Sequence, residues 1–190
     1  TDDNNCGTSE SISISEPTLL TATVQEPDNI LDFSFAGEYN NQFIYYHTAP
    51  LYWTDARAKA QANNGDLVII NTAVDNNYFT SVTTSTCWIG LYQDLSDPNY
   101  SEPSGGWKWI DGTPLSYSNW AANEPNNGAS GGQDFGCFNY NGIGLWDDFH
   151  TLLPFIMAID VSQSNNFSTS CNGGNDAQTY VTAGGGTTPY

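Results

Sequence analysis

Oxygen-bearing side chains recur throughout the sequence, and two of the short segments that carry them could act together. One segment is Glu124-Pro125-Asn126 and the other is Trp146-Asp147-Asp148. Calcium is a hard cation that takes about six to eight oxygen ligands, and carboxylates and side-chain amides supply such oxygens. These residue types at these places could therefore hold a calcium ion.

Other patterns give little reason to expect catalysis. The run Gly128-Ala129-Ser130-Gly131-Gly132 has the spacing of a nucleophile elbow, but it lacks the strand before and the helix after that the elbow requires. A Gly/Ser-rich loop explains it better. His47 and His150 are the only imidazoles, and zinc-protease, phosphate-loop and dinucleotide motifs are missing from the sequence. No carboxylate pair has a pattern diagnostic of glycoside hydrolysis, so we expect no enzyme.

The charge balance excludes two classes of partner. The 190 residues include 21 Asp and Glu but only 3 Lys and Arg, which gives a net charge of -18. Nucleic-acid phosphates and anionic membranes both require a basic surface, so we expect neither as a partner. No stretch approaches the roughly 20 apolar residues of a membrane span, so membrane insertion is not expected. The acidity suits an exported protein in salty, divalent-rich water, although solubility alone would also explain it.

The cysteines are four in number, and none forms a C-x-x-C pair, so a thiolate zinc site is not expected. They are Cys6, Cys87, Cys137 and Cys171. An even count in an apparently exported chain indicates disulfides, but the residues alone leave the pairing open.

Composition divides the chain into three parts. The aromatic-rich part, 35–160, contains all 6 Trp and is expected to be the main domain. The flanks, 1–34 and 161–190, are rich in Ser, Thr, Asn, Asp and Gly. They contain short strand-like stretches at 11–15, 20–24 and 179–183. The sequence begins and ends within such patterns, so we expect a segment of a longer protein.

Within the central part, the Ala-rich segment 53–62 is expected to be a helix, with Thr54 as N-cap and Asn64-Gly65 as the stop. A second helix is expected over 75–82. Apolar runs predict strands over 43–46, 67–70, 87–91, 138–145 and 152–159. The segment 92–136 reads as a long loop, and loops of that length inside a domain are usually functional.

Several short motifs follow one another in the order found in C-type lectin domains, which residues 35–160 resemble. They are Trp53…Ala56, Gly65-Asp66-Leu67, Trp88-Ile89-Gly90-Leu91, Gly106-Trp107-Lys108-Trp109-Ile110-Asp111-Gly112, Ser118-Asn119-Trp120, Glu124-Pro125-Asn126, Trp146-Asp147-Asp148 and Phe155-Ile156-Met157. The resemblance implies an α+β C-type lectin-like fold. Two helices, two small antiparallel sheets and a long loop region that carries the site would make up this fold.

The resemblance also implies a calcium site, with the Glu124–Pro125 peptide in cis. Carried over residue by residue, the calcium ligands are Glu124, Asn126, Gln133, Asp147 and Asp148, the last also through its carbonyl. The family usually has Glu where Gln133 stands and Asn where Asp147 stands. The exchange keeps three carboxylates, and it would let Asp147 accept from a sugar hydroxyl while the Gln133 amide donates to one.

The function that the resemblance implies is calcium-dependent sugar binding, in which two vicinal hydroxyls coordinate the ion. The sugar-binding residues would be Glu124, Asn126, Gln133 and Asp147. Family members with Glu-Pro-Asn usually bind mannose, glucose, N-acetylglucosamine or fucose, so cell-surface or matrix glycans are the expected partners. One shallow site should bind only at about millimolar Kd, so adhesion would need many copies. Trp107, Trp109 and Trp120 are expected in the core rather than in a sugar platform.

Further expectations from the resemblance concern a second ion and the cysteines. Asp94, Glu102, Asn127 and Asp134 match an auxiliary calcium site, with a solvated acidic loop as the alternative. Cys87 and Cys137 fall on strands that neighbour each other in the family and are expected to form a disulfide; two buried thiols are the alternative. The family's own disulfide positions hold Ala60 with Met157 and Phe135 with Thr151.

The flanks are similar to repeats of gliding adhesins of Bacteroidetes, with 1–34 as the end of one β-rich repeat and 161–190 as the start of the next. This implies an extracellular, bacterial cell-surface location. Cys6 and Cys171 could pair with neighbouring repeats or with each other. Plain polar linkers are the alternative. A lectin-like protein-binding module, an ice-binding domain or a filament-forming spacer without sugar binding is the alternative function.

Overall fold

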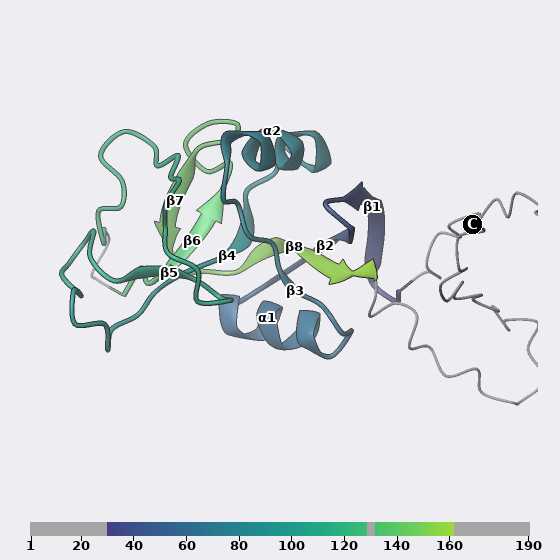
Figure 1. Ribbon diagram of the computed structural model, residues 1–190, viewed down its shortest axis with the longest axis horizontal. Coiled ribbons are helices and arrows are strands. Elements are labelled where there is room, and N and C mark those ends of the chain that lie inside the picture. Colours follow the sequence, from purple (N-terminus) through teal and green to yellow (C-terminus); the bar gives the residue numbers. More distant parts are fainter. Residues whose placement is uncertain (1–29, 129–131, 162–190) are drawn as a thin grey trace, which may run out of the picture. The chain divides into compact units, whose positions relative to one another are not determined.

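In the computed structural model, which describes residues 30–128 and 132–161, the two helices lie on opposite sides of a sheet (Figure 1). The helices are α1 (Trp53–Gln61) and α2 (Ala73–Val82). The strands are β1 (Phe33–Tyr39), β2 (Gln42–Leu51), β3 (Asp66–Leu67), β4 (Cys87–Gln93), β5 (Trp107–Trp109), β6 (Phe135–Phe138), β7 (Trp146–Phe149) and β8 (Leu153–Asp160).

The sheet runs in the order β1-β2-β8-β4-β6-β7, with β3 paired to β8 and β5 paired to β4. Its pairs are antiparallel except for one parallel contact, Trp88 with Phe155, between β4 and β8. That contact joins the two antiparallel groups that the resemblance implies into one mixed sheet. The α+β C-type lectin-like fold is therefore confirmed. The long connections around β5, β6 and β7 gather at the end of the fold that lies away from β1 (Figure 1).

Both faces of the sheet are buried, and each helix covers one of them. Trp53 of α1 packs in one cluster with Trp88, whereas Phe79 of α2 packs in the other cluster with Ile89. Strand β4 contributes alternate side chains to the two clusters and is buried on both sides, which explains its nearly continuous apolar sequence. Trp107, Trp109 and Trp146 are buried as well, so the first two belong to the core, as expected.

One prediction about the ends of the first helix is wrong, and the other is confirmed. Helix α1 begins at Trp53 and has no side-chain cap, so the assignment of Thr54 as its N-cap is wrong. The stop is confirmed, because Asn64 adopts the left-handed φ of 60° and the Gly65 N–H donates to the Ala60 carbonyl at 3.1 Å. In α2 it is Thr72 that caps, accepting from the Asp75 N–H at 3.1 Å.

The predicted strand over 138–145 is wrong. Strand β6 ends at Phe138, and 139–145 form a hairpin loop that returns the chain into β7. The loop begins at Asn139, which has a left-handed φ of 67° that an apolar-pattern argument cannot detect. Strand β3 is also shorter than the 67–70 expected, and strands β1 and β5 were not predicted.

The predicted Cys87–Cys137 disulfide is wrong, because both residues are free, buried thiols. In the β4–β6 pair Cys87 lies opposite Phe138, and Trp88 lies opposite Cys137. Directly opposed residues share a face and adjacent residues do not, so the two thiols point to opposite faces of the sheet. Ala60 and Met157, at one of the family's disulfide positions, are fully buried in the same apolar cluster.

The strand-like stretches at 11–15, 20–24 and 179–183, together with Cys6 and Cys171, lie outside the described residues. Strand β1 begins at Phe33, so it crosses the boundary expected between 34 and 35. Neither helix in the described part of the chain is long and apolar enough to cross a membrane.

Candidate metal and ligand site

The site is built where the loop after Trp120 meets strand β7. Asp148 on β7 is fully buried, and its carboxylate accepts hydrogen bonds from two backbone N–H groups of the loop. These come from Asn126 at 2.9 Å and from Asn127 at 2.6 Å. The Glu124–Pro125 peptide is cis, as the resemblance implies. A rigid strand therefore fixes the loop that carries the Glu-Pro-Asn motif.

Three carboxylates meet at this place. Ligand atoms of Glu124, Asp147 and Asp148 all lie within 4.8 Å of one another. Burial, followed by the charge of Asp147, raises the pKa of Glu124 to about 7. Burial, followed by the charge of Asp148, raises the pKa of Asp147 to about 6. Like charges held this close are unfavourable without a counter-charge, so the cluster suits a cation.

Two buried oxygens in the site are acceptors that lack a donor. Glu124 Oε2 and Gln133 Oε1 have no hydrogen-bond partner among the described residues. A Cβ atom on Gly128 would lie 2.6 Å from Asn126 Oδ1 and 3.1 Å from Gln133 Oε1, so these oxygens face one space that only a glycine leaves open. Unsatisfied oxygen acceptors beside a carboxylate cluster fit a hard cation such as calcium.

The structure brings together all five residues expected to bind calcium, but it changes two of the expected roles. The Gln133 amide nitrogen donates to the Asp148 carbonyl oxygen at 2.8 Å. The Asp148 carbonyl was expected to bind calcium, but it accepts this hydrogen bond instead. The Gln133 amide was expected to donate to a sugar hydroxyl, but it donates within the protein. What Gln133 presents to the site is its Oε1 acceptor.

Asn141, in the hairpin loop between β6 and β7, is a site residue that sequence reasoning missed. Its amide nitrogen donates to Asp147 Oδ2 at 2.6 Å. The loop reaches back over β7, and nothing in the local pattern around Asn141 signals this contact. Gly128 was also missed as a site residue, although it stands in the Gly/Ser-rich run that was assigned to a loop.

One of the four residues expected to form the auxiliary calcium site is paired with a basic side chain of the protein. Asp94 instead holds the ammonium of Lys108 at 2.8 Å, and Asp97 holds it at 2.6 Å. Hydrogen bonding to Lys108 lowers the pKa of Asp94 to about 2. Among the described residues, Asp94, Glu102 and Asp134 form no carboxylate group like that of the first site. Asp94 is thus paired with a partly exposed lysine, and the auxiliary site stays a prediction.

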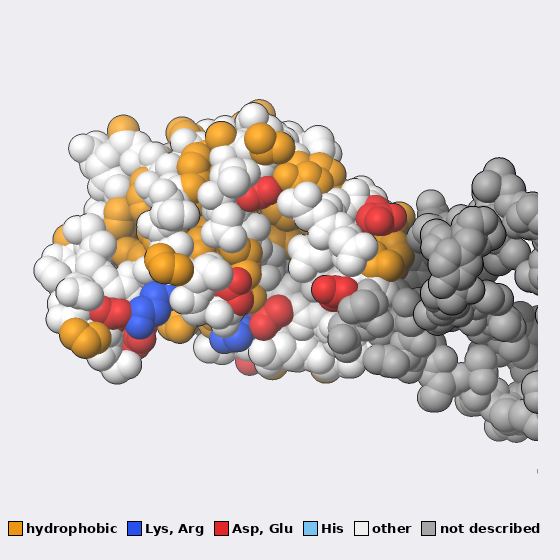
Figure 2. Space-filling view, viewed as in Figure 1, with side chains coloured by type: hydrophobic (Ala, Val, Ile, Leu, Met, Phe, Trp, Pro, Cys, Tyr) orange, Lys and Arg blue, Asp and Glu red, His pale blue; other side chains and the backbone are white. Residues whose placement is uncertain are grey.

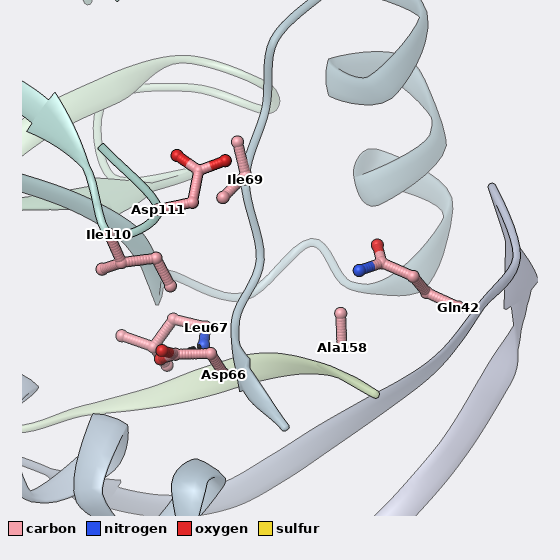
Figure 3. A pocket seen from close by; sticks show the side chains of 7 residues that line it. All are labelled: Gln42, Asp66, Leu67, Ile69, Ile110, Asp111 and Ala158. Atoms are coloured by element: carbon pink, nitrogen blue, oxygen red, sulfur yellow. Dashed lines mark hydrogen bonds between the residues drawn. The ribbon is translucent and has the colours of Figure 1, made fainter. Parts of the chain in front are cut away.

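A pocket of about 150 Å³ lies elsewhere, between β2, β3, β8 and the segment after β5. Figure 3 shows Gln42 and Ala158 across the pocket from Leu67 and Ile110. None of the expected calcium ligands lines it. Asp66, one of the two carboxylates that line it, is held by Arg57 at 3.1 Å, so this pocket is not the candidate site.

All three basic side chains of the chain are paired with carboxylates. Lys59 pairs with Asp32 at 3.1 Å, and Arg57 and Lys108 pair as described above. On the face shown in Figure 2, the blue basic side chains lie against red acidic ones. A surface with its few cations already neutralised favours uncharged or cationic ligands over anionic ones.

The fold and the site define a C-type lectin-like binding domain. The profile of the Lectin C-type domain family matches residues 49–151, which is more than half of the chain. The chain therefore belongs to the C-type lectin domain family. The match confirms that this is a non-enzymatic binding domain, of a family whose members typically recognise carbohydrates.

The similar curated proteins include the human "C-type lectin domain family 10 member A", which is 29% identical over 118 residues that cover 58% of this chain and 34% of that protein. The mouse "C-type mannose receptor 2" is 32% identical over 120 residues, covering 60% of this chain and 7% of the receptor. The chain thus spans only a part of these relatives. Among solved structures, the human scavenger receptor C-type lectin carbohydrate-recognition domain matches with a TM-score of 0.56 and 26% identity, over 70% of this chain and 98% of that domain.

Proposed function

We propose that this domain binds carbohydrate through one calcium ion held by Glu124, Asn126, Gln133, Asp147 and Asp148. The observation that carries the proposal is the pair of buried, unpartnered acceptors, Glu124 Oε2 and Gln133 Oε1, beside the carboxylate cluster. Calcium, when bound, would supply open coordination positions for two vicinal sugar hydroxyls.

The chain's own residues prepare this site before any ligand arrives. The Asp148 carboxylate holds the backbone of Asn126 and Asn127 in place, and Gly128 keeps the space in front of the Asn126 and Gln133 oxygens open. Side chains fixed in this way lose little further freedom when they bind, which favours affinity. Asp147 is oriented by Asn141 and retains carboxylate lone pairs that can accept from a sugar hydroxyl.

A neutral sugar is the ligand class that suits these groups. With Glu124 and Asn126 in the motif, we propose sugars of the mannose, glucose, N-acetylglucosamine or fucose type. The paired cations of the surface disfavour strongly anionic glycans. The affinity of one shallow site for a monosaccharide should be at about the millimolar level, so useful adhesion depends on many copies.

A glycan array run in calcium and again in chelator tests the proposal, with calorimetry of calcium alone as the companion measurement. Calcium binding together with chelator-sensitive glycan binding is the expected result. Glycan binding that is unchanged in chelator would contradict the mechanism. Binding of neither calcium nor any glycan would favour a protein-binding or spacer role.

We also propose that the domain acts outside the cell, as C-type lectin domains typically do. We further propose that 1–34 and 161–190 belong to repeats of a bacterial surface adhesin, as their resemblance to such repeats implies. Labelling intact source cells with an antibody against the domain tests this setting. Signal only after permeabilisation would contradict it.

A further inference from the structure

The hairpin loop 139–145 is tied to its surroundings by hydrogen bonds although it contains no regular structure. Asn139 donates to the Thr83 carbonyl at 2.9 Å and accepts from the Gly144 N–H at 2.6 Å. The Gly144 carbonyl in turn accepts from Asn76 at 3.0 Å and from Asn119 at 2.7 Å. Both ends of the loop are thus tied to neighbouring parts of the fold.

Tyr140, in this loop, has an aromatic ring that faces solvent and packs against a second ring. Tyr140 is 49% exposed, and its ring centroid lies 4.7 Å from that of Phe149 at an interplanar angle of 48°. Phe149 in turn meets Trp88 of the core edge-on, with 6.1 Å between centroids. Tyr140 is thus available to a ligand, and a ligand that covered its apolar ring would gain favourable burial.

The Tyr140 ring lies beside residues that contact the candidate calcium site. Asn141, the next residue, donates to Asp147 Oδ2 at 2.6 Å, and Tyr140 contacts Phe149, two positions further along β7. Residues two apart on a strand share a face and lie about 7 Å from each other. Tyr140 therefore packs on a residue that lies about 7 Å along β7 from Asp147, a separation close to the length of one sugar unit.

We propose that Tyr140 is a specificity-determining residue that contacts the second sugar unit of a neutral oligosaccharide whose first unit is bound at the Glu124–Asp147–Asp148 site. This inference rests on the proposed function. The phenol ring offers an apolar face to the C–H surface of a sugar and a hydroxyl to its rim. Because the loop is already fixed, little ordering entropy opposes the contact.

The experiment compares monosaccharide with disaccharide binding by the full chain in saturating calcium. The probes are methyl α-mannoside with α-linked mannobiose, and methyl N-acetylglucosaminide with chitobiose, titrated by calorimetry or ligand-observed NMR. We expect the unsubstituted chain to bind one disaccharide about threefold to tenfold more tightly than its monosaccharide. Tyr140→Ala should remove that preference but preserve calcium and monosaccharide affinity, and Tyr140→Phe should retain most of it.

Ile143→Ala is the matched control, since Ile143 is 67% exposed on the same loop and should have no effect. Equal loss of calcium, monosaccharide and disaccharide affinity in Tyr140→Ala would show a merely structural role and overturn the inference. So would an unchanged disaccharide preference, or no preference in the unsubstituted chain. If the unsubstituted chain binds calcium but no sugar, the proposed function fails, and this inference fails with it.

Discussion

The carboxylate of Asp148 accepts a hydrogen bond from the backbone N–H of Asn127 at 2.6 Å, across a separation of 21 residues in the sequence. A buried strand residue thereby fixes a loop that has no regular structure of its own. The same carboxylate belongs to the cluster that could hold calcium. With Asp148 as the proposed ligand, binding of the metal would therefore be coupled to the order of the loop through one side chain.

Replacing Asp148 should expose this coupling. Asp148→Asn keeps the shape of the side chain but removes one charge and turns one acceptor oxygen into a donor. We expect calcium affinity to fall by about a hundredfold or more. Amide exchange at Asn126 or Asn127 should accelerate by on the order of tenfold to a hundredfold, which NMR can measure residue by residue.

Asp111→Asn is the matched control for that substitution. Asp111 also accepts from a backbone N–H and a side chain, those of Thr113 at 2.8 and 2.7 Å, but it is not in the carboxylate cluster. Its replacement should leave calcium affinity unchanged. Equal calcium affinities in the Asp148→Asn and unsubstituted chains would refute the assignment of Asp148 as a ligand.

Gly128→Ala should weaken calcium binding without unfolding the domain. The new methyl group would lie 2.6 Å from Asn126 Oδ1, so at least one site oxygen must move. Overpacking of this kind costs about 1–3 kcal/mol, which corresponds to a loss of calcium affinity of about fivefold to 150-fold. Calorimetry of calcium binding and thermal melts in chelator separate the two effects.

Gly112→Ala is the control, because it should lower the stability of the domain and leave its calcium affinity unchanged. Gly112 has a φ of +82° and no atom within 4 Å of an added Cβ, so alanine there meets backbone strain but no contact. We expect a lower Tm with unchanged calcium affinity. A loss of calcium affinity as large as that of Gly128→Ala would show that the first effect is not local.

Calcium affinity should fall as the pH is lowered from about 7.5 to about 5.5. The pKa of Glu124 is raised to about 7 and that of Asp147 to about 6, so protons compete with the metal in this interval. We expect a loss of at least about tenfold, measured by calorimetry at several pH values. A flat profile would contradict the carboxylate assignment.

The metal-free domain should show the opposite dependence of stability. A carboxyl group whose pKa is higher in the folded state than in the unfolded state stabilises the fold at low pH, and this contribution is lost as the pH rises through the folded-state pKa. In chelator, Glu124 and Asp147 should therefore make the Tm lower at about pH 7.5 than at about pH 5.5. Glu124→Gln, which cannot titrate, should reduce that difference.

Calorimetry should give one calcium ion per chain, because Lys108 already neutralises Asp94 and Asp97. Lys108→Met should leave the calcium affinity of the first site unchanged. It should make the segment between β4 and β5 more sensitive to limited proteolysis, since three charge-linked side chains are released. Two calcium ions per unsubstituted chain would contradict this and restore the auxiliary site.

Cys87 and Cys137 should react as thiols only after unfolding. Both are buried, and burial raises the pKa of each thiol. Alkylation without reductant, followed by peptide mapping, should modify both in denaturant and neither in the native protein. A Cys87–Cys137 cross-linked peptide would contradict the β4–β6 register.

Much of the fold could be predicted from residue order alone. The apolar run 87–91 and the Ala-rich segment 53–62 are local patterns, and local patterns report which backbone conformation buries apolar surface. The sequence could not reveal that Phe138 ends a strand, because the turn depends on the left-handed backbone of Asn139 and on its bonds to Thr83 and Gly144. Those contacts are non-local.

At the candidate site, too, some features follow from the sequence and others depend on the tertiary structure. The resemblance to C-type lectin domains predicted Glu124, Asn126, Asp147 and Asp148 as oxygen ligands, which their residue types allow because ligand chemistry is a property of the side chain. The tertiary structure was needed to show that the Gln133 amide donates to the Asp148 carbonyl and that Lys108 forms an ion pair with Asp94. It also decided that Cys87 and Cys137 face apart, since a shift of one residue in register reverses the side of a sheet to which a side chain points.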